Sequence, residues 1–207
     1  ACCSSKRFIV QENIYDEFAG RLAERLKGMK IGDPLDQGSR VGPLIDERAA
    51  QRVEEIVDRT VKAGAYCLCG GRRFDGNFFE PTVLTGVTPA MDIAQNLEVF
   101  GPVFPLIKFK TEEQAVAIAD NCTYGLSSGV ISGEIQRAIR VARQLDAGNC
   151  IAHMICRLAD TEKVGSVQRD CMLRWMNLRR QRRMCGKGLR SDDGGEGTKA
   201  QTKGNNV

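Results

Sequence analysis

Strand-like and helix-like stretches alternate along most of the first 150 residues of this 207-residue chain. Strand-forming runs occupy residues 6–11, 65–69, 78–87, 103–109, 126–132 and 149–152. The run at 103–109 (VFPLIKF) is almost continuously apolar, which is typical of a strand covered on both faces. Strands that alternate with two-faced helices predict an α/β fold, with a mostly parallel sheet and helices on both of its faces.

The strands are joined by four helical stretches, at residues 13–29, 46–64, 111–120 and 135–145. Asn13 and Asp46 are expected to cap the first two, and Gly64 to end the second. Thr111 and Gln114 form a capping box for the third. The residues of the first helix expected to face the core are Ile14, Phe18, Leu22, Leu26 and Met29. Those of the second are Val53, Ile56, Val57 and Val61.

The charge of the chain changes sign near residue 150. Residues 1–150 contain 18 Lys+Arg and 20 Asp+Glu, whereas residues 151–207 contain 12 and 6. The last ten residues offer almost nothing to bury, as in a disordered segment. We therefore predict a folded unit at 1–150 and an irregular basic tail at 151–207. The tail is either a basic arm that binds RNA or acidic lipid, or an extension foreign to the fold.

The sequence favours a cytoplasmic protein. No apolar run comes close to the roughly 18 residues of a membrane helix, and no secretory signal opens the chain. Nine cysteines at irregular spacing favour a reducing compartment over a disulfide framework. Cys67 and Cys69 are interpreted as small apolar side chains of a strand, because a metal site needs further ligands and the chain has one His. We predict no metal site.

The first candidate for chemistry is residues 1–7 (ACCSSKR), just before the first strand. A cysteine there can present its sulfur at a sheet end, where substrates bind in open α/β sheets. The reactive form is the thiolate, which is scarce at neutral pH for an ordinary pKa of about 8.5. The site must therefore supply positive potential or a base. Lys6 and Arg7 bring cationic charge close in sequence; the alternative is a solvated, charged sheet edge.

The second candidate is residues 97–103 (LEVFGPV), which lead directly into the apolar strand. Glu98 and Phe100 are two residues apart, so they point to the same side of an extended chain. A carboxylate can accept hydrogen bonds from ribose hydroxyls while a ring packs against a planar heterocycle. The alternative is a capping Glu beside a core Phe.

Together these motifs resemble the aldehyde dehydrogenase superfamily. In that family the nucleophilic Cys is followed by Arg at the fifth position and then by a strand, as Cys2 is followed by Arg7 and FIV. The family motif E-x-F-G-P-V matches residues 98–103. Further similar stretches lie at 42–45 (GPLI), 79–84 (FEPTVL), 121–126 (NCTYGL) and 140–148 (RVARQLDAG).

The resemblance implies that Cys2 attacks an aldehyde carbon and that its backbone N–H helps to hold the oxyanion of the thiohemiacetal. Hydride then passes to NAD or NADP, and water hydrolyses the thioester to a carboxylic acid. Glu98 would hold the nicotinamide ribose, and Phe100 would lie against the nicotinamide end of the cofactor. Residues 3–5 are candidates for the border of the aldehyde pocket, while Gly101 and Pro102 are expected to be structural. A homo-oligomer is expected for the full-length protein.

Parts of the family pattern do not occur in the sequence. They are the Gly-Gln pair before the nucleophile, the cofactor-binding domain, the general-base Glu, the oxyanion-hole Asn and the P-F-G-G stretch after residue 149. We therefore expect a fragment that oxidises no aldehyde by itself, followed by a segment from a shifted reading frame. Alternatives are the subclass that transfers the acyl group to coenzyme A, or an inert remnant or interaction module. Binding of nucleic acid by the tail is not expected to be specific.

Overall fold

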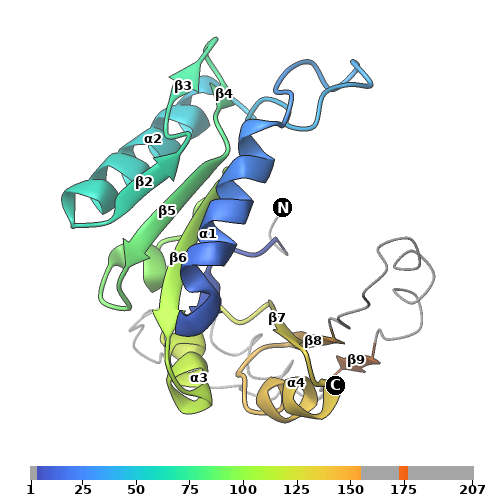
Figure 1. Ribbon diagram of the computed structural model, residues 1–207. Helices are drawn as coiled ribbons and strands as arrows, with labels where there is room; N and C mark the ends of the chain where they lie inside the picture. The colour runs from blue at the N-terminus through green and yellow to red at the C-terminus, as the bar shows by residue number, and fades with distance from the viewer. Residues whose placement is uncertain (1–3, 155–172, 177–207) are drawn as a thin grey trace, which may run out of the picture.

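The computed structural model describes residues 4–154 and 173–176 (Figure 1). Its central sheet has the strand order β1-β6-β5-β2. These strands are β1 (Phe8–Gln11), β2 (Tyr66–Cys69), β5 (Thr82–Val87) and β6 (Val103–Phe109). β6 runs parallel to both of its neighbours, and β2 pairs antiparallel with β5 at the edge. The mostly parallel sheet predicted from the sequence is confirmed.

Three helices cover the two faces of this sheet: α1 (Glu12–Lys27), α2 (Glu47–Lys62) and α3 (Glu112–Asp120). Successive strand residues alternate between the faces, as the pleat of a strand requires. Val83 and Leu106 pack in the cluster under α1, whereas Leu84 and Ile107 pack in the larger cluster with α2 and α3. Figure 1 shows α1 and α2 on opposite sides of β5. Helices on both faces, as predicted, therefore bury β5 and β6.

The remaining elements form a hairpin, a short 3-10 helix, and a second sheet with one helix packed against it. They are β3 (Arg73–Phe74), β4 (Phe78–Phe79), η1 (Asp92–Ala94), β7 (Ser127–Ser132), α4 (Ile135–Ala142), β8 (Asn149–Met154) and β9 (Leu173–Met176). β7 and β8 are parallel, and β9 pairs antiparallel with β8. The expected boundary at residue 150 falls inside β8, and β9 lies within the segment expected to be irregular. None of the helices described is long and apolar enough to span a membrane.

The single strand expected at residues 78–87 is divided at Pro81. Proline has no backbone N–H to contribute to a ladder, so strand pairing changes where it occurs. Before it, β4 pairs with β3; after it, β5 pairs with β6. Gly70, which follows β2 with φ +74°, lies close to the Pro81 carbonyl group.

The buried face of α1 differs from the predicted stripe. The helix begins earlier than expected, because Gln11 rather than Asn13 is the N-cap and accepts a hydrogen bond from the Asn13 amide. The buried residues are Tyr15, Ala19, Ala23 and Leu26, whereas Ile14 and Phe18 are 52% and 36% exposed. Leu26 is buried as predicted, and Leu22 and Met29 pack against the same cluster. The buried face therefore overlaps the predicted stripe in part and is turned toward the small Ala19 and Ala23, which let the helix approach the sheet closely.

The predicted features of α2 and α3 are largely confirmed. The Asp46 carboxylate accepts a hydrogen bond of 2.7 Å from the Ala49 amide, as an N-cap should. The Gln114 amide donates to the Thr111 hydroxyl, and the Gln114 side-chain oxygen accepts from the Lys110 amide. Val53, Ile56 and Val57 are buried, but Val61 is 39% exposed. Ala63 is the C-cap of α2, and Gly64 follows with φ +107°.

Replacing Gly70 with alanine is expected to lower the free energy of unfolding by about 3 kcal/mol. The φ of +74° disfavours an L side chain, and a Cβ atom would lie 2.2 Å from the Pro81 carbonyl oxygen. Gly20→Ala is the matched control, because a Cβ at that helical position meets nothing within 4 Å. It should raise the stability by about 0.5–1 kcal/mol. Urea unfolding followed by circular dichroism measures both, and equal effects would contradict the geometry.

Candidate active site

The two candidate segments of the sequence analysis lie next to each other, at the same end of the central sheet. Residues 4–7 lead into β1 and residues 98–102 lead into β6, and these strands pair in parallel with Phe8 opposite Leu106. Segments that precede neighbouring parallel strands meet at the amino ends of those strands. The site is therefore at the amino-terminal ends of these strands. Open α/β sheets usually bind ligands at the carboxyl-terminal ends instead.

Lys6 joins the two segments directly. Its Nζ donates a hydrogen bond of 3.2 Å to the carbonyl oxygen of Val99, 93 residues away in the sequence. The same ammonium lies 3.9 Å from Glu98 Oε1 and 4.1 Å from the centroid of the Phe100 ring. The side chain is only 20% exposed. Lys6 is therefore not part of a solvated sheet edge, which was the alternative interpretation of this pair of cations.

Glu98 and Phe100 lie on the same side of their segment, as predicted from their spacing. Val99 between them is 4% exposed and belongs to the core cluster of α2 and α3. Phe100 is 53% exposed, and the Glu98 side chain is 26% exposed. The alternative of a core Phe is therefore wrong, because the core position is taken by Val99. An acid and a ring are presented together, at the boundary between core and solvent.

Gly101 holds this segment close to α2. A Cβ atom at Gly101 would lie 2.8 Å from Cγ2 of Val53, nearer than side chains tolerate. The next residue, Pro102, accepts a hydrogen bond of 2.8 Å from the Thr82 amide at the start of β5. The Gly-Pro pair thus fixes the segment against both the helix and the sheet, in agreement with the structural role expected of it.

Arg7 anchors the other segment to the carboxyl end of α3. Its guanidinium donates to the carbonyl oxygens of Ile118 at 3.1 Å, Ala119 at 2.8 Å and Ala94 at 3.2 Å. It also donates to Cys122 Sγ at 2.9 Å. The last carbonyls of a helix have no partner within the helix, and a cation suits the negative end of its dipole. Arg7 therefore satisfies both requirements at once.

The predicted nucleophile Cys2 and its neighbour Cys3 lie outside the described residues. Ser4 and Ser5, expected to border the aldehyde pocket, are exposed. The structure thus brings Glu98 and Phe100 together and ties them to the segment that follows Cys2. The contacts of Lys6 and Arg7 were not foreseen, and the only signal for them in the sequence was two cations directly before a strand.

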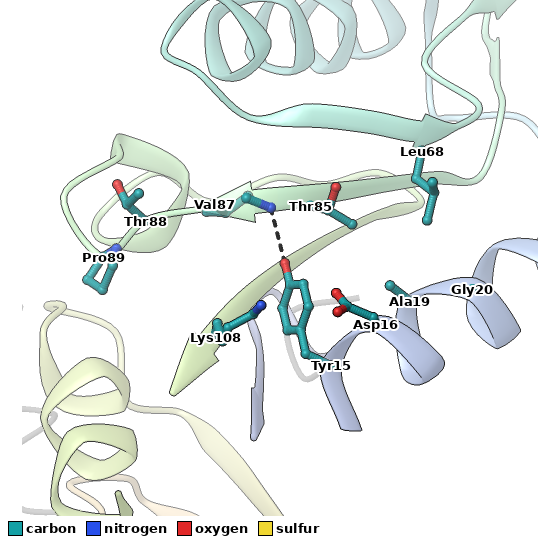
Figure 2. A pocket seen from close by; sticks show the side chains of 11 residues that line it. Tyr15, Asp16, Ala19, Gly20, Leu68, Thr85, Val87, Thr88, Pro89 and Lys108 are labelled. Atoms are coloured by element: carbon teal, nitrogen blue, oxygen red, sulfur yellow. Dashed lines mark hydrogen bonds between the residues drawn. The ribbon is translucent and has the colours of Figure 1, made fainter. Parts of the chain in front are cut away.

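A separate cavity of about 650 Å³ lies between α1 and strands β2, β5 and β6 (Figure 2). Its walls include Tyr15, Leu68, Thr85 and Lys108, but neither Glu98 nor Phe100. The Tyr15 hydroxyl donates to the Leu106 carbonyl oxygen and accepts from the Gly86 amide. The cavity is thus formed where a tyrosine holds α1 to the sheet, and it is not the predicted site.

Two other cysteines of the described part, Cys67 and Cys150, are poorly suited to act as thiolates. Burial raises the pKa of Cys150, which is half-buried. Desolvation, followed by the nearby Cys69 and Glu80, raises the pKa of Cys67. Within residues 4–154 and 173–176, no three His, Cys, Asp or Glu side chains gather as metal ligands would.

Comparison with known proteins decides the family. The profile described as "Aldehyde dehydrogenase family" matches residues 1–165. The chain belongs to the aldehyde dehydrogenase family. The match continues past residue 150, where the charge pattern changes.

Similar aldehyde dehydrogenases include the succinate-semialdehyde dehydrogenase [NADP(+)] of Deinococcus radiodurans, 43% identical over 150 residues, which are 72% of this chain and 31% of the relative. The glutarate-semialdehyde dehydrogenase of Pseudomonas putida is 40% identical over 147 residues, covering 71% of this chain and 30% of the relative. The chain thus spans about a third of the length of the curated relatives it matches.

Solved structures give the same fold. A succinate-semialdehyde dehydrogenase from Burkholderia pseudomallei has a TM-score of 0.70 and 40% identity, covering 74% of this chain and 32% of that one. A betaine aldehyde dehydrogenase from Staphylococcus aureus, solved in complex with NAD+, has a TM-score of 0.70 and 36% identity over 74% of this chain and 31% of its own.

Arg7→Met is expected to lower the free energy of unfolding by about 3 kcal/mol, because it removes charge-assisted hydrogen bonds to three carbonyl oxygens. Arg7→Lys should recover only part of this loss, since an ammonium lacks the planar fork of the guanidinium. Arg21→Met is the control, because the Arg21–Glu17 pair is largely exposed and should change stability by less than about 0.5 kcal/mol. Chemical denaturation distinguishes them, and an Arg7→Met protein as stable as the control would contradict the anchor.

Proposed function

We propose that this chain carries the nucleophile and part of the cofactor site of an NAD(P)-dependent aldehyde dehydrogenase that oxidises an aldehyde to a carboxylic acid. One observation carries the proposal. The residues that follow Cys2 are joined through Lys6 to the acid and ring of the 98–103 motif. A nucleophile and a hydride acceptor must act on the same carbon atom, so their binding segments have to be neighbours.

In this proposal Cys2 is the catalytic residue. Its thiolate forms a bond to the aldehyde carbon, and the carbonyl oxygen becomes an oxyanion that accepts a hydrogen bond from the Cys2 backbone N–H. Bound NAD or NADP supplies the acceptor for the hydride. The thioester that remains on Cys2 is hydrolysed by water, which releases the acid and regenerates the thiol.

Glu98 and Phe100 suit a dinucleotide by their chemistry. Among the described residues, the Glu98 carboxylate forms no hydrogen bond, and the Lys6 ammonium lies 3.9 Å from its Oε1. A carboxylate has several lone-pair positions, so Glu98 retains the capacity to accept from two ribose hydroxyls. The exposed ring of Phe100 offers an apolar face to a flat heterocycle. Relatives support either cofactor, since one is named for NADP(+) and another was solved with NAD+.

The proposed chemistry needs the first part of the chain and not the basic segment. Both motifs and the strands that carry them lie within residues 1–150. In the second part, the structure describes residues 151–154 and 173–176, which are strands of the second sheet. We propose that residues 151–207 contribute no catalytic group, that the enzyme is a cytoplasmic homo-oligomer at full length, and that it does not bind nucleic acid.

Thiol labelling tests the nucleophile without any cofactor. At neutral pH, Cys2 should react with iodoacetamide about ten times faster than Cys67 or Cys150, the difference made by one pKa unit. Desolvation raises the pKa of both control thiols, which keeps them protonated. Peptide mass spectrometry after timed quenching measures each site separately. Equal rates at the three cysteines would count against Cys2 as a preformed nucleophile.

The purified 207-residue chain is expected to oxidise no aldehyde by itself. Placing a hydride acceptor against the substrate supplies on the order of 7–11 kcal/mol of such a barrier, and the chain spans only about a third of the length of its relatives. Absorbance at 340 nm after mixing the chain with an aldehyde and NAD or NADP provides the measurement. A Cys2→Ser chain gives the baseline, and NAD(P)H production above it would refute the expectation.

A further inference from the structure

The Lys6 ammonium contacts three consecutive residues of the 98–103 motif, and the three contacts differ in kind. The hydrogen bond to the Val99 carbonyl oxygen, at 3.2 Å, fixes the backbone of the motif. The Phe100 ring lies under the ammonium at 4.1 Å, well within the range of a cation–π contact. The Glu98 carboxylate is 3.9 Å away, which is close enough for attraction but too far for a hydrogen bond.

At these distances Lys6 orients the Glu98 carboxylate without occupying its oxygen atoms in a hydrogen bond. A close ion pair would occupy carboxylate oxygens that a ligand needs, and no charge nearby would leave the carboxylate free to rotate. At 3.9 Å the ammonium holds the charge in place while both oxygens keep lone pairs for another donor. At 20% exposure for Lys6 and 26% for Glu98, the pair is shielded from much of the solvent that weakens surface pairs.

The position of Lys6 in the sequence gives these contacts a further consequence. It is four residues after Cys2 and directly before Arg7, which is bound to the end of α3. Within the described residues 4–7, the chain is therefore held at both Lys6 and Arg7. The same lysine therefore restrains the segment of the nucleophile and the two side chains of the cofactor motif.

We propose that Lys6 is a positioning residue that keeps Glu98 and Phe100 in register with the nucleophile segment for binding of the nicotinamide end of the cofactor. This inference rests on the proposed function for its ligand. In this proposal Lys6 contacts neither substrate nor cofactor, and it acts through the Glu98 carboxylate and the Phe100 ring.

Hydrogen–deuterium exchange on the 207-residue chain tests the structural part. Lys6→Met keeps an apolar stem and removes the ammonium, so amides at 97–101 should exchange about tenfold faster, as expected for losing contacts of this kind. Lys6→Arg should restore the wild-type rate, because a guanidinium can bind the same carbonyl, carboxylate and ring. Lys108→Met is the matched control, since Lys108 lies 4.6 Å from the centroid of the Tyr15 ring in a second cation–π contact among the described residues. It should leave residues 97–101 unchanged, and unchanged exchange in Lys6→Met would overturn the proposal.

Steady-state kinetics of the full-length enzyme test the proposed role of Lys6 in cofactor binding. Lys6→Met should raise KM for NAD(P) about tenfold, while KM for the aldehyde stays within about twofold. Lys6→Arg should restore the wild-type KM for NAD(P). A general loss of structure would instead lower kcat and alter both KM values, and that result would overturn the positioning role. The labelling rate of wild-type Cys2 separates the two ideas. A reactive Cys2 with an unchanged KM in Lys6→Met refutes only the role of Lys6, whereas an unreactive Cys2 refutes the proposed function itself.

Discussion

The parallel pairing of β1 with β6 is the contact on which the candidate site depends. It aligns Phe8 with Leu106 and continues to Gln11 and Phe109, so the two strands start at the same edge of the sheet. The pairing is stable because β6 is an inner strand of the sheet. Leu106 and Ile107 are fully buried, one under α1 and the other under α2 and α3. Without it, the segments that precede the strands would have no reason to meet.

Lys6 and Arg7 fix the positions of the segments that precede β1 and β6. Lys6 binds the motif before β6, and Arg7 binds the carbonyl oxygens at the end of α3. Each cation satisfies groups that would otherwise be left poorly paired, namely a loop carbonyl and the terminal carbonyls of a helix. Gly101 completes the arrangement, because its lack of a side chain lets the motif rest on Val53. The site is thus supported by α2 and α3 as well as by the sheet.

The differences between expectation and structure have physical causes. Helical periodicity found α1 but selected Ile14 and Phe18, because it weighs apolar size and cannot weigh how closely a helix must approach a sheet; Ala19 and Ala23 meet that requirement. The divided strand at Pro81 followed from the loss of one donor, which a run of strand-forming residues conceals. The sequence placed both segments directly before their strands, but it did not show that these two strands are neighbours, so the end of the sheet that they share came from the pairing of β1 with β6.

The sequence alone determined the class of fold, most of the alternation of strands and helices, the N-caps of α2 and α3, and the family. These depend on side-chain periodicity and on short motifs, both of which are local properties. It also determined that Glu98 and Phe100 share one side of the chain, because an extended backbone alternates. Only the tertiary structure decided that β6 lies between β1 and β5, and therefore that Lys6 meets a motif 93 residues away. Strand order depends on the burial of whole faces against helices, and no local pattern encodes which strands become neighbours.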